Sequence, residues 1–224
     1  MKPILASLSF LLLSYFAFGQ NAEKISLETT RLIVFDVTAK QEPYKGKDAL
    51  VLEQTRPIDN QKTFALLKNM DFHNGVIEIT LAGAVGNKNV EGARGFVGVV
   101  FRVNKDTSAF EQFYIRPTNG RANDQVRRNH STQYVSYPGF PWEKLRKESP
   151  EKYESYADLV PGEWTKLKIV VKEETAQLFV NGAEQPALIV SDLKQGKEAR
   201  GSIGLWIGPG TLAQFADLQV TKWD

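Results

Sequence analysis

The chain has 224 residues, a formal net charge of +2, 42% hydrophobic and 11% aromatic residues, and no cysteine. This composition is ordinary for a globular protein of one domain, and so small a net charge argues against a dedicated nucleic-acid-binding protein. Without cysteine the chain has no disulfides, no thiolate metal site and no cysteine nucleophile. Its stability must therefore come from a hydrophobic core.

The N-terminal segment has the features of a secretory signal peptide. Lys2 gives it a basic start, an apolar run extends from Ile4 to Phe18, and Ala17 and Gly19 are small residues of the kind that signal peptidase requires. The run is too short, and too soon followed by polar chain, to make a good membrane span. We expect residues 1–19 to be removed, leaving residues 20–224 as a single domain without a transmembrane segment, exported to the periplasm or secreted.

From residue 31 onward the sequence predicts short β-strands separated by turns. The segments expected to be strands are rich in β-branched and apolar residues. They cover residues 32–37, 49–54, 63–67, 75–81, 95–103, 110–117, 164–172, 175–180, 201–208 and 212–223. In GVIEITL, Ile77, Ile79 and Leu81 alternate with other side chains, which predicts a strand with one face in the core. The nearly all-apolar run 95–103 suits a central strand.

Turn signals separate these runs. Glu173-Glu174 allows a turn, and Asn181-Gly182 is a strong signal for a tight hairpin turn. Pro150 prevents a long helix in the charged segment 144–159. Roughly a dozen short strands, with turns between them and no long amphipathic helix, predict an all-β fold: an antiparallel two-sheet β-sandwich or jelly roll.

The segment from Phe113 to Trp142 is the candidate functional loop, because it combines charged and aromatic residues without a regular apolar period. Arginine forks, amides and flat rings together suit a polar ligand with an apolar face, such as a sugar. The residues of these types are Arg116, Arg121, Arg127, Arg128, Asn119, Asn123, Asn129, Gln125, Tyr134, Tyr137, Phe140 and Trp142. The alternative is a solvated excursion that its aromatic residues pin to the surface.

A polar surface is expected beside this loop. Gln112, Tyr114 and Arg116 share one face of the strand at 110–117. If neighbouring strands pair as we expect, Glu78 and Arg102 join them on that surface. The alternative for these two residues is a cross-strand ion pair on a solvated sheet.

The order of motifs resembles a known superfamily. FHNGVIEITL, GFVGVVFRV, WTKLKIVVKEETAQLFVNG and GSIGLWIGPGTLAQFADLQVTKW follow one another, and this series is similar to the concanavalin A-like lectin/glucanase superfamily, in its laminin-G-like and 3-keto-disaccharide hydrolase branches. The resemblance implies a concanavalin A-like jelly roll. It also implies a sheet face that receives an oligo- or disaccharide. The strands expected above place Glu78, Arg102, Gln112, Tyr114 and Arg116 on that face.

The candidate catalytic residues are Glu78, Glu111, Asp124 and His130. The Glu-x-Asp-x-x-Glu motif of family 16 glycoside hydrolases is absent, so their two-carboxylate mechanism is not carried over. A pair built from different segments, such as Glu78 or Glu111 with Asp124, remains open. His130 is either a base, a metal ligand or a hydrogen-bonding residue, and its only fellow histidine, His73, is far away in sequence. No metal site and no cofactor are expected, since the sequence has no ligand spacing or nucleotide-binding motif.

Three functions remain in competition: an enzyme of the 3-keto-disaccharide hydrolase type, a non-catalytic glycan-binding module, and a structural or adhesion domain of laminin-G type. For the first two we expect one ligand site. Its binding residues would be Arg102, Gln112, Tyr114, Arg116, Arg127, Arg128 and Trp142. Asp124 would hold the arginines of this site or, alternatively, only staple the loop.

Overall fold

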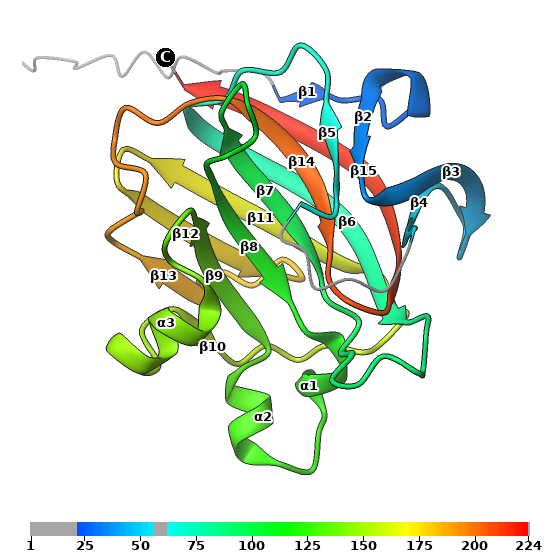
Figure 1. The fold of residues 1–224 in the computed structure, drawn as a ribbon, viewed down its shortest axis with the longest axis vertical. Coiled ribbons are helices and arrows are strands. Elements are labelled where there is room, and N and C mark those ends of the chain that lie inside the picture. Colours follow the sequence, from blue (N-terminus) through cyan, green and yellow to red (C-terminus); the bar gives the residue numbers. More distant parts are fainter. Residues whose placement is uncertain (1–21, 56–61, 224) are drawn as a thin grey trace, which may run out of the picture.

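The computed structural model describes residues 22–55 and 62–223, which form a sandwich of two antiparallel sheets (Figure 1). The expected signal peptide at residues 1–19 lies outside the described residues. Within them, no helix has both the length and the apolar character needed to cross a bilayer. The predicted all-β sandwich is confirmed.

Sheet A carries one face of the core. Its strands are hydrogen-bonded in the order β13 (Leu188–Val190), β12 (Thr175–Val180), β11 (Thr165–Lys172), β6 (Asn74–Val85), β15 (Thr211–Trp223), β4 (Lys47–Gln54) and β3 (Val37–Tyr44), and β1 (Glu23–Lys24) also pairs with β15.

Sheet B carries the other face. Its order is β10 (Glu154–Ser155), β9 (Thr132–Tyr137), β8 (Phe110–Ile115), β7 (Val97–Val103), β14 (Ser202–Ile207), β5 (Phe64–Leu67) and β2 (Leu32–Phe35). The short helices are η1 (Thr29–Arg31), α1 (Pro117–Gly120), α2 (Gln125–Asn129) and α3 (Trp142–Glu148). In Figure 1, α1, α2 and α3 gather near the end of the sandwich where β10 lies.

The core lies between the sheets and follows the predicted alternation. Ile77, Ile79 and Leu81 of β6 are buried, whereas Glu78 between them is exposed. On sheet B, Phe101 of β7 stacks on Phe113 of β8, with ring centroids 6.1 Å apart. Every residue of β7 is buried, as expected of a strand with neighbours on both sides. Side chains alternate across a strand, so Gln112 and Tyr114, which flank Phe113 on β8, face away from sheet A.

The segment from Phe113 to Trp142 is more regular than its sequence indicates. It leaves β8, forms α1 and α2, and returns as β9, which pairs with β8 in antiparallel register. The backbone closes at the base of this excursion, where the Arg116 amide donates to the Ser131 carbonyl at 2.8 Å. The expectation of a long irregular loop is therefore wrong for its second half, since β9 continues the sheet.

Two further expectations concern turns and edges. Asn181 and Gly182 have φ of 53° and 75°, and the Ala183 amide donates to Val180 at 3.1 Å, so the predicted turn is present. Pairing of β12 with β13 resumes only at Leu188, so this is not a two-residue hairpin. Strand β3 was missed because it is polar and contains a proline, which a strand at the edge of a sheet tolerates.

Candidate functional site

A cavity of about 490 Å³ lies on the face of sheet B that points away from sheet A. That volume is in the usual range for small-molecule sites. Side chains from β8, β9, β14, α3 and the α1–α2 segment contribute to its lining, together with residues that precede β7. They include Arg94, Phe96, Gln112, Tyr114, Arg116, Asn119, Arg127, His130, Val135, Tyr137, Trp142, Glu143, Arg146 and Trp206.

Aromatic rings form the floor of this cavity. Tyr114 of β8 and Trp206 of β14 both lie opposite Gly98 on the intervening strand β7, and their ring centroids are 5.0 Å apart. A Cβ at Gly98 would lie 2.6 Å from the Tyr114 Cβ and 2.2 Å from the Phe113 carbonyl oxygen. The absent side chain is what allows two large rings to meet across a central strand. Burial raises the pKa of Tyr114 to about 12, so its hydroxyl stays protonated.

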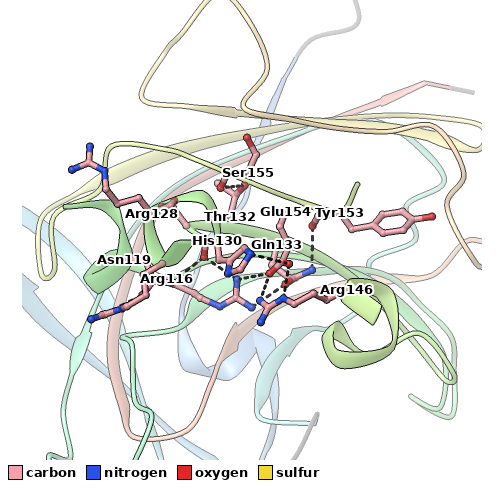
Figure 2. Close-up of polar contacts among 12 residues, drawn as sticks. Arg116, Asn119, Arg128, His130, Thr132, Gln133, Arg146, Tyr153, Glu154 and Ser155 are labelled. Atoms are coloured by element: carbon pink, nitrogen blue, oxygen red, sulfur yellow. Dashed lines mark hydrogen bonds and ion pairs between the residues drawn. The ribbon is translucent and has the colours of Figure 1, made fainter. Parts of the chain in front are cut away.

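Arg116 closes one end of the floor and is fully engaged there. Its Nη1 donates to the His130 carbonyl at 2.9 Å and to Glu154 at 3.3 Å, and its Nη2 donates to the Tyr114 hydroxyl at 3.0 Å and the Gln133 amide oxygen at 2.9 Å. The guanidinium also lies 4.9 Å from the centroid of the Tyr114 ring. These contacts hold the arginine in place, and Figure 2 shows those with His130, Gln133 and Glu154.

Glu154 is the carboxylate at the centre of this cluster, although it belongs to the two-residue strand β10. Its side chain is 2% exposed and contacts two arginines. Arg146 of α3 donates from Nε at 2.7 Å and also from Nη2. The hydrogen bond to Glu154 raises the pKa of Arg146, so this arginine keeps its charge. Two guanidinium groups on one carboxylate leave an excess of one positive charge beside the cavity (Figure 2).

His130 follows α2 and faces the same cluster. Its Nε2 lies 3.7 Å from the nearer Glu154 oxygen, too far for a hydrogen bond, and its side chain is 20% exposed. Burial is the main cause that lowers the pKa of His130 below its ordinary value of 6.5. At neutral pH the imidazole is therefore uncharged, and one ring nitrogen has a lone pair that can accept a proton.

The structure brings most of the predicted ligand-binding residues to this cavity. Those that line it are Gln112, Tyr114, Arg116, Arg127 and Trp142, and the candidate catalytic residue His130 lines it too. Arg127 reaches it from α2, held by Asn119 at 3.3 Å and the Thr118 carbonyl at 3.4 Å. The Arg127 Nε is buried and has no hydrogen-bond partner among the residues that the structure describes.

Asp124 and Arg128 are outside the cavity lining. Asp124 is exposed and caps α2, because its carboxylate accepts from the Arg127 amide at 3.0 Å. Figure 2 shows Arg128 directed away from the Arg116–Glu154 cluster. Its Nη2 donates to the Tyr156 hydroxyl at 3.0 Å, and its guanidinium lies 5.0 Å from that ring. The carboxylate that holds Arg116 is thus Glu154 and not Asp124.

The two glutamates proposed as catalytic partners lie away from the cavity. Glu78 is exposed on sheet A, opposite Lys168 of β11, so it cannot share a surface with Gln112 on sheet B. Glu111 points between the sheets, where it accepts from the Tyr134 hydroxyl at 2.6 Å and from the Gln195 amide at 2.8 Å. Burial raises the pKa of Glu111.

Arg102 does not line the cavity, and its side chain is held by hydrogen bonds within the fold. It has φ of 52° at a break in the β7–β14 register, so its side chain leaves the expected alternation. The guanidinium is buried and donates to the carbonyls of His73 at 2.9 Å and Glu173 at 2.8 Å, and to the Asn74 amide oxygen at 3.1 Å. The expected surface containing both Glu78 and Arg102, and their alternative ion pair, are both wrong.

Sequence reasoning missed several residues of the site: Phe96, Gln133, Arg146, Glu154 and Trp206. Glu154 and Arg146 lie in a charged segment without period, and nothing local distinguishes them from a solvated face. Trp206 had a usable signal. In GSIGLWIG, the alternation places it on the side opposite Ile203, Leu205 and Ile207, where a large ring requires something to cover it.

The described residues offer no obvious metal centre. Among residues 22–55 and 62–223, no group of three or more histidine or carboxylate side chains is arranged to hold an ion. The carboxylate nearest His130 is already shared by Arg116 and Arg146.

Comparison with known proteins gives one family and several similar folds. The family model described as a 3-keto-alpha-glucoside-1,2-lyase-like domain matches residues 37–221. No functionally curated protein shows significant sequence similarity to the chain. Carbohydrate binding module CBM66 from Bacillus subtilis has a TM-score of 0.55 and 11% identity, covering 84% of this chain and 97% of its own. A Bacillus subtilis protein of unknown function with a galectin-like fold has a TM-score of 0.51 and 13% identity, covering 84% and 87%. At such identities the structural similarity shows the fold alone.

Proposed function

We propose, because the chain belongs to the family of 3-keto-alpha-glucoside-1,2-lyase-like domains, that it binds a carbohydrate in the sheet B cavity and cleaves the glycosidic bond of 3-keto-glycosides. The family is one of carbohydrate-related β-sandwich proteins. The observation that carries the proposal is the position of His130, whose pKa is lowered by burial, beside a cluster with excess positive charge at the end of an aromatic floor.

The family's name describes an elimination across C1 and C2 of the sugar ring. A ketone at C3 makes the hydrogen on C2 acidic. When a base removes that proton, the electrons of the C2–H bond form the C1=C2 bond. The bond between C1 and the glycosidic oxygen breaks, and this oxygen leaves with the electron pair and takes up a proton. No oxidant or reductant is consumed, because the ketone is already present in the substrate.

The geometry offers a residue for each requirement of this reaction. His130 has the lone pair and the position of a general base. The excess positive charge of Arg116, Glu154 and Arg146 stabilises the negative charge that develops on the C3 oxygen, because it is fixed in place before reaction. Protonated His130 or solvent returns the proton to the leaving oxygen. Tyr114 and Trp206 provide the apolar surface on which a sugar ring packs.

A non-catalytic glycan-binding function is the second candidate. It is favoured by the engagement of Glu154 with two arginines, because a carboxylate held in this way is a poor proton carrier. A purely structural domain is disfavoured, since a filled, flat sheet face would leave no cavity of about 490 Å³.

Replacing His130 with Asn tests the proposal, since Asn keeps a polar side chain but cannot take the proton. We expect kcat on a 3-keto-α-glucoside to fall about 10²- to 10⁴-fold while KM changes little. Cleavage is measured from the amount of second sugar released and from the ultraviolet absorbance of the unsaturated ketone. Binding of the wild-type protein to the sugar without any turnover would instead establish the glycan-binding function.

The pH profile provides a control on the role of His130. Its folded-state pKa is lowered from 6.5, so the uncharged, active form persists below that pH and the acid limb of kcat/KM lies below pH 6.5. The unfolded chain binds the proton more readily in the same window, so stability also falls as the pH falls through it. If the acid limb lay above pH 6.5, His130 would not be the base.

A further inference from the structure

Gln112 has a buried amide that the fold does not use. The residue is 1% exposed, and its Nε2 has no hydrogen-bond partner among the described residues. It nevertheless contributes to the lining of the cavity. A buried donor without an acceptor costs free energy, so such groups in native proteins call for an explanation.

The position of Gln112 separates it from the reacting end of the site. Gln112, Tyr114 and Arg116 point to the same side of the chain, so Gln112 is about 13 Å from Arg116 along the strand direction. The aromatic floor of Tyr114 and Trp206 lies between these two ends. The cavity therefore has a charged end at Arg116 and a second end at Gln112, with an apolar surface between them.

The cross-strand neighbours of Gln112 are apolar, which disfavours a water trapped between the strands as its partner. Its registered neighbours on β7 and β9 are Val100 and Val135. Ordered buried waters make about two to four hydrogen bonds, and these valines offer no side-chain donor or acceptor. An acceptor that arrives with a ligand satisfies the amide without that requirement.

We propose that Gln112 donates a hydrogen bond to the second sugar of a disaccharide, the one that leaves when the bond is cleaved. This inference rests on the proposed function, which puts the ketone-bearing ring at the Arg116–Glu154 end. Gln112 is a positioning residue for this second sugar.

Gln112→Met tests the proposal, because methionine has a similar length and no donor. The substrates are a 3-keto-disaccharide of two α-linked glucose units and the methyl glycoside of 3-keto-α-glucose. Loss of one hydrogen bond predicts a fall of about tenfold in kcat/KM for the disaccharide and no change for the methyl glycoside. The melting temperature should stay the same or rise, since the variant removes an unsatisfied buried donor.

Gln133→Met is the matched control on the adjacent strand. The Gln133 amide accepts from Arg116 at 2.9 Å and donates to the carbonyls of Tyr134 at 2.9 Å and Tyr153 at 3.1 Å. This variant should lower the melting temperature. If Gln112→Met lowered the melting temperature as much as Gln133→Met does, the proposal would be overturned, because Gln112 would then have a structural role.

The kinetic outcomes distinguish a failure of the inference about Gln112 from a failure of the proposed function. If wild-type protein cleaves both substrates and Gln112→Met changes both equally or neither, the inference fails and the proposed function stands. If wild-type protein only binds, calorimetric affinities for the two compounds replace kcat/KM in the same comparison. If it neither binds nor cleaves either compound, the proposed function fails and the inference fails with it.

Discussion

Two arginines that look equivalent in the sequence differ in what they do for the fold. Arg116 is buried and donates to four acceptors, including Glu154. Arg127 is only half-buried, and its side chain makes two long hydrogen bonds. The first fixes the geometry of the site, and the second offers unused donors to a ligand. Removing Arg127 therefore leaves the contacts between Arg116, Glu154 and Arg146 in place.

Replacement of each arginine by alanine should therefore separate stability from binding. Arg116→Ala leaves the Gln133 and Tyr114 side chains without a donor and removes half of the charge that neutralises Glu154, so we expect a loss of about 2–3 kcal/mol in the free energy of unfolding. Arg127→Ala should cost about 1 kcal/mol or less and still weaken sugar binding. Urea denaturation and calorimetry measure the two effects. Equal denaturation midpoints for the two variants would contradict this assignment.

At the scale of elements, strands with a clear apolar pattern could be predicted from sequence, whereas β9 could not. In β6, Ile77 and Ile79 alternate with the exposed Glu78, and this pattern is unambiguous. In β9, Gln133 and Ser136 are as buried as Tyr134 and Val135. Polar residues on both faces erase the alternation, so the sequence of this segment indicates a loop where the structure has a strand.

The turn at Asn181-Gly182 provides a test of a predicted element. Gly182 has φ of 75°, and a Cβ there would meet no atom within 4 Å, so the only cost of a side chain is backbone strain. Gly182→Val should lower the free energy of unfolding by about 1 kcal/mol or more. Gly182→Asn is the control and should cost less, because asparagine tolerates the left-handed region. Equal midpoints in urea for valine and asparagine would show that this turn does not remain left-handed in solution.

At the scale of the whole molecule, the fold could be predicted because it depends on patterns that repeat along the chain. The site depends on which strands become neighbours. Arg116 meets Glu154 across 38 positions of sequence, through strand β9, which had not been recognised. The grouping of Gln112, Tyr114 and Arg116 is correct because the first two share one face of β8 and Arg116 directly follows that strand. Glu78 and Arg102 were misplaced because their strand neighbours and a register break cannot be read locally.

The two sheets are joined by a buried polar network as well as by the apolar core. Glu111 of β8 accepts from the Tyr134 hydroxyl at 2.6 Å and from the Gln195 amide at 2.8 Å, and the Lys194 amide donates to the same hydroxyl at 2.9 Å. Residues 194 and 195 follow β13, the edge strand of sheet A, whereas Glu111 and Tyr134 belong to sheet B. A substitution of Glu111 should therefore destabilise both sheets.

Glu111→Ala tests this coupling because it leaves the Tyr134 hydroxyl and the Gln195 amide buried without their acceptor. We expect the free energy of unfolding to fall by about 3 kcal/mol or more, with a single transition that moves as a whole in differential scanning calorimetry. Glu111→Gln keeps one acceptor oxygen and removes the buried charge, so its midpoint should lie closer to that of the wild type. Two resolved transitions in Glu111→Ala would mean that the sheets unfold separately and that the network does not couple them.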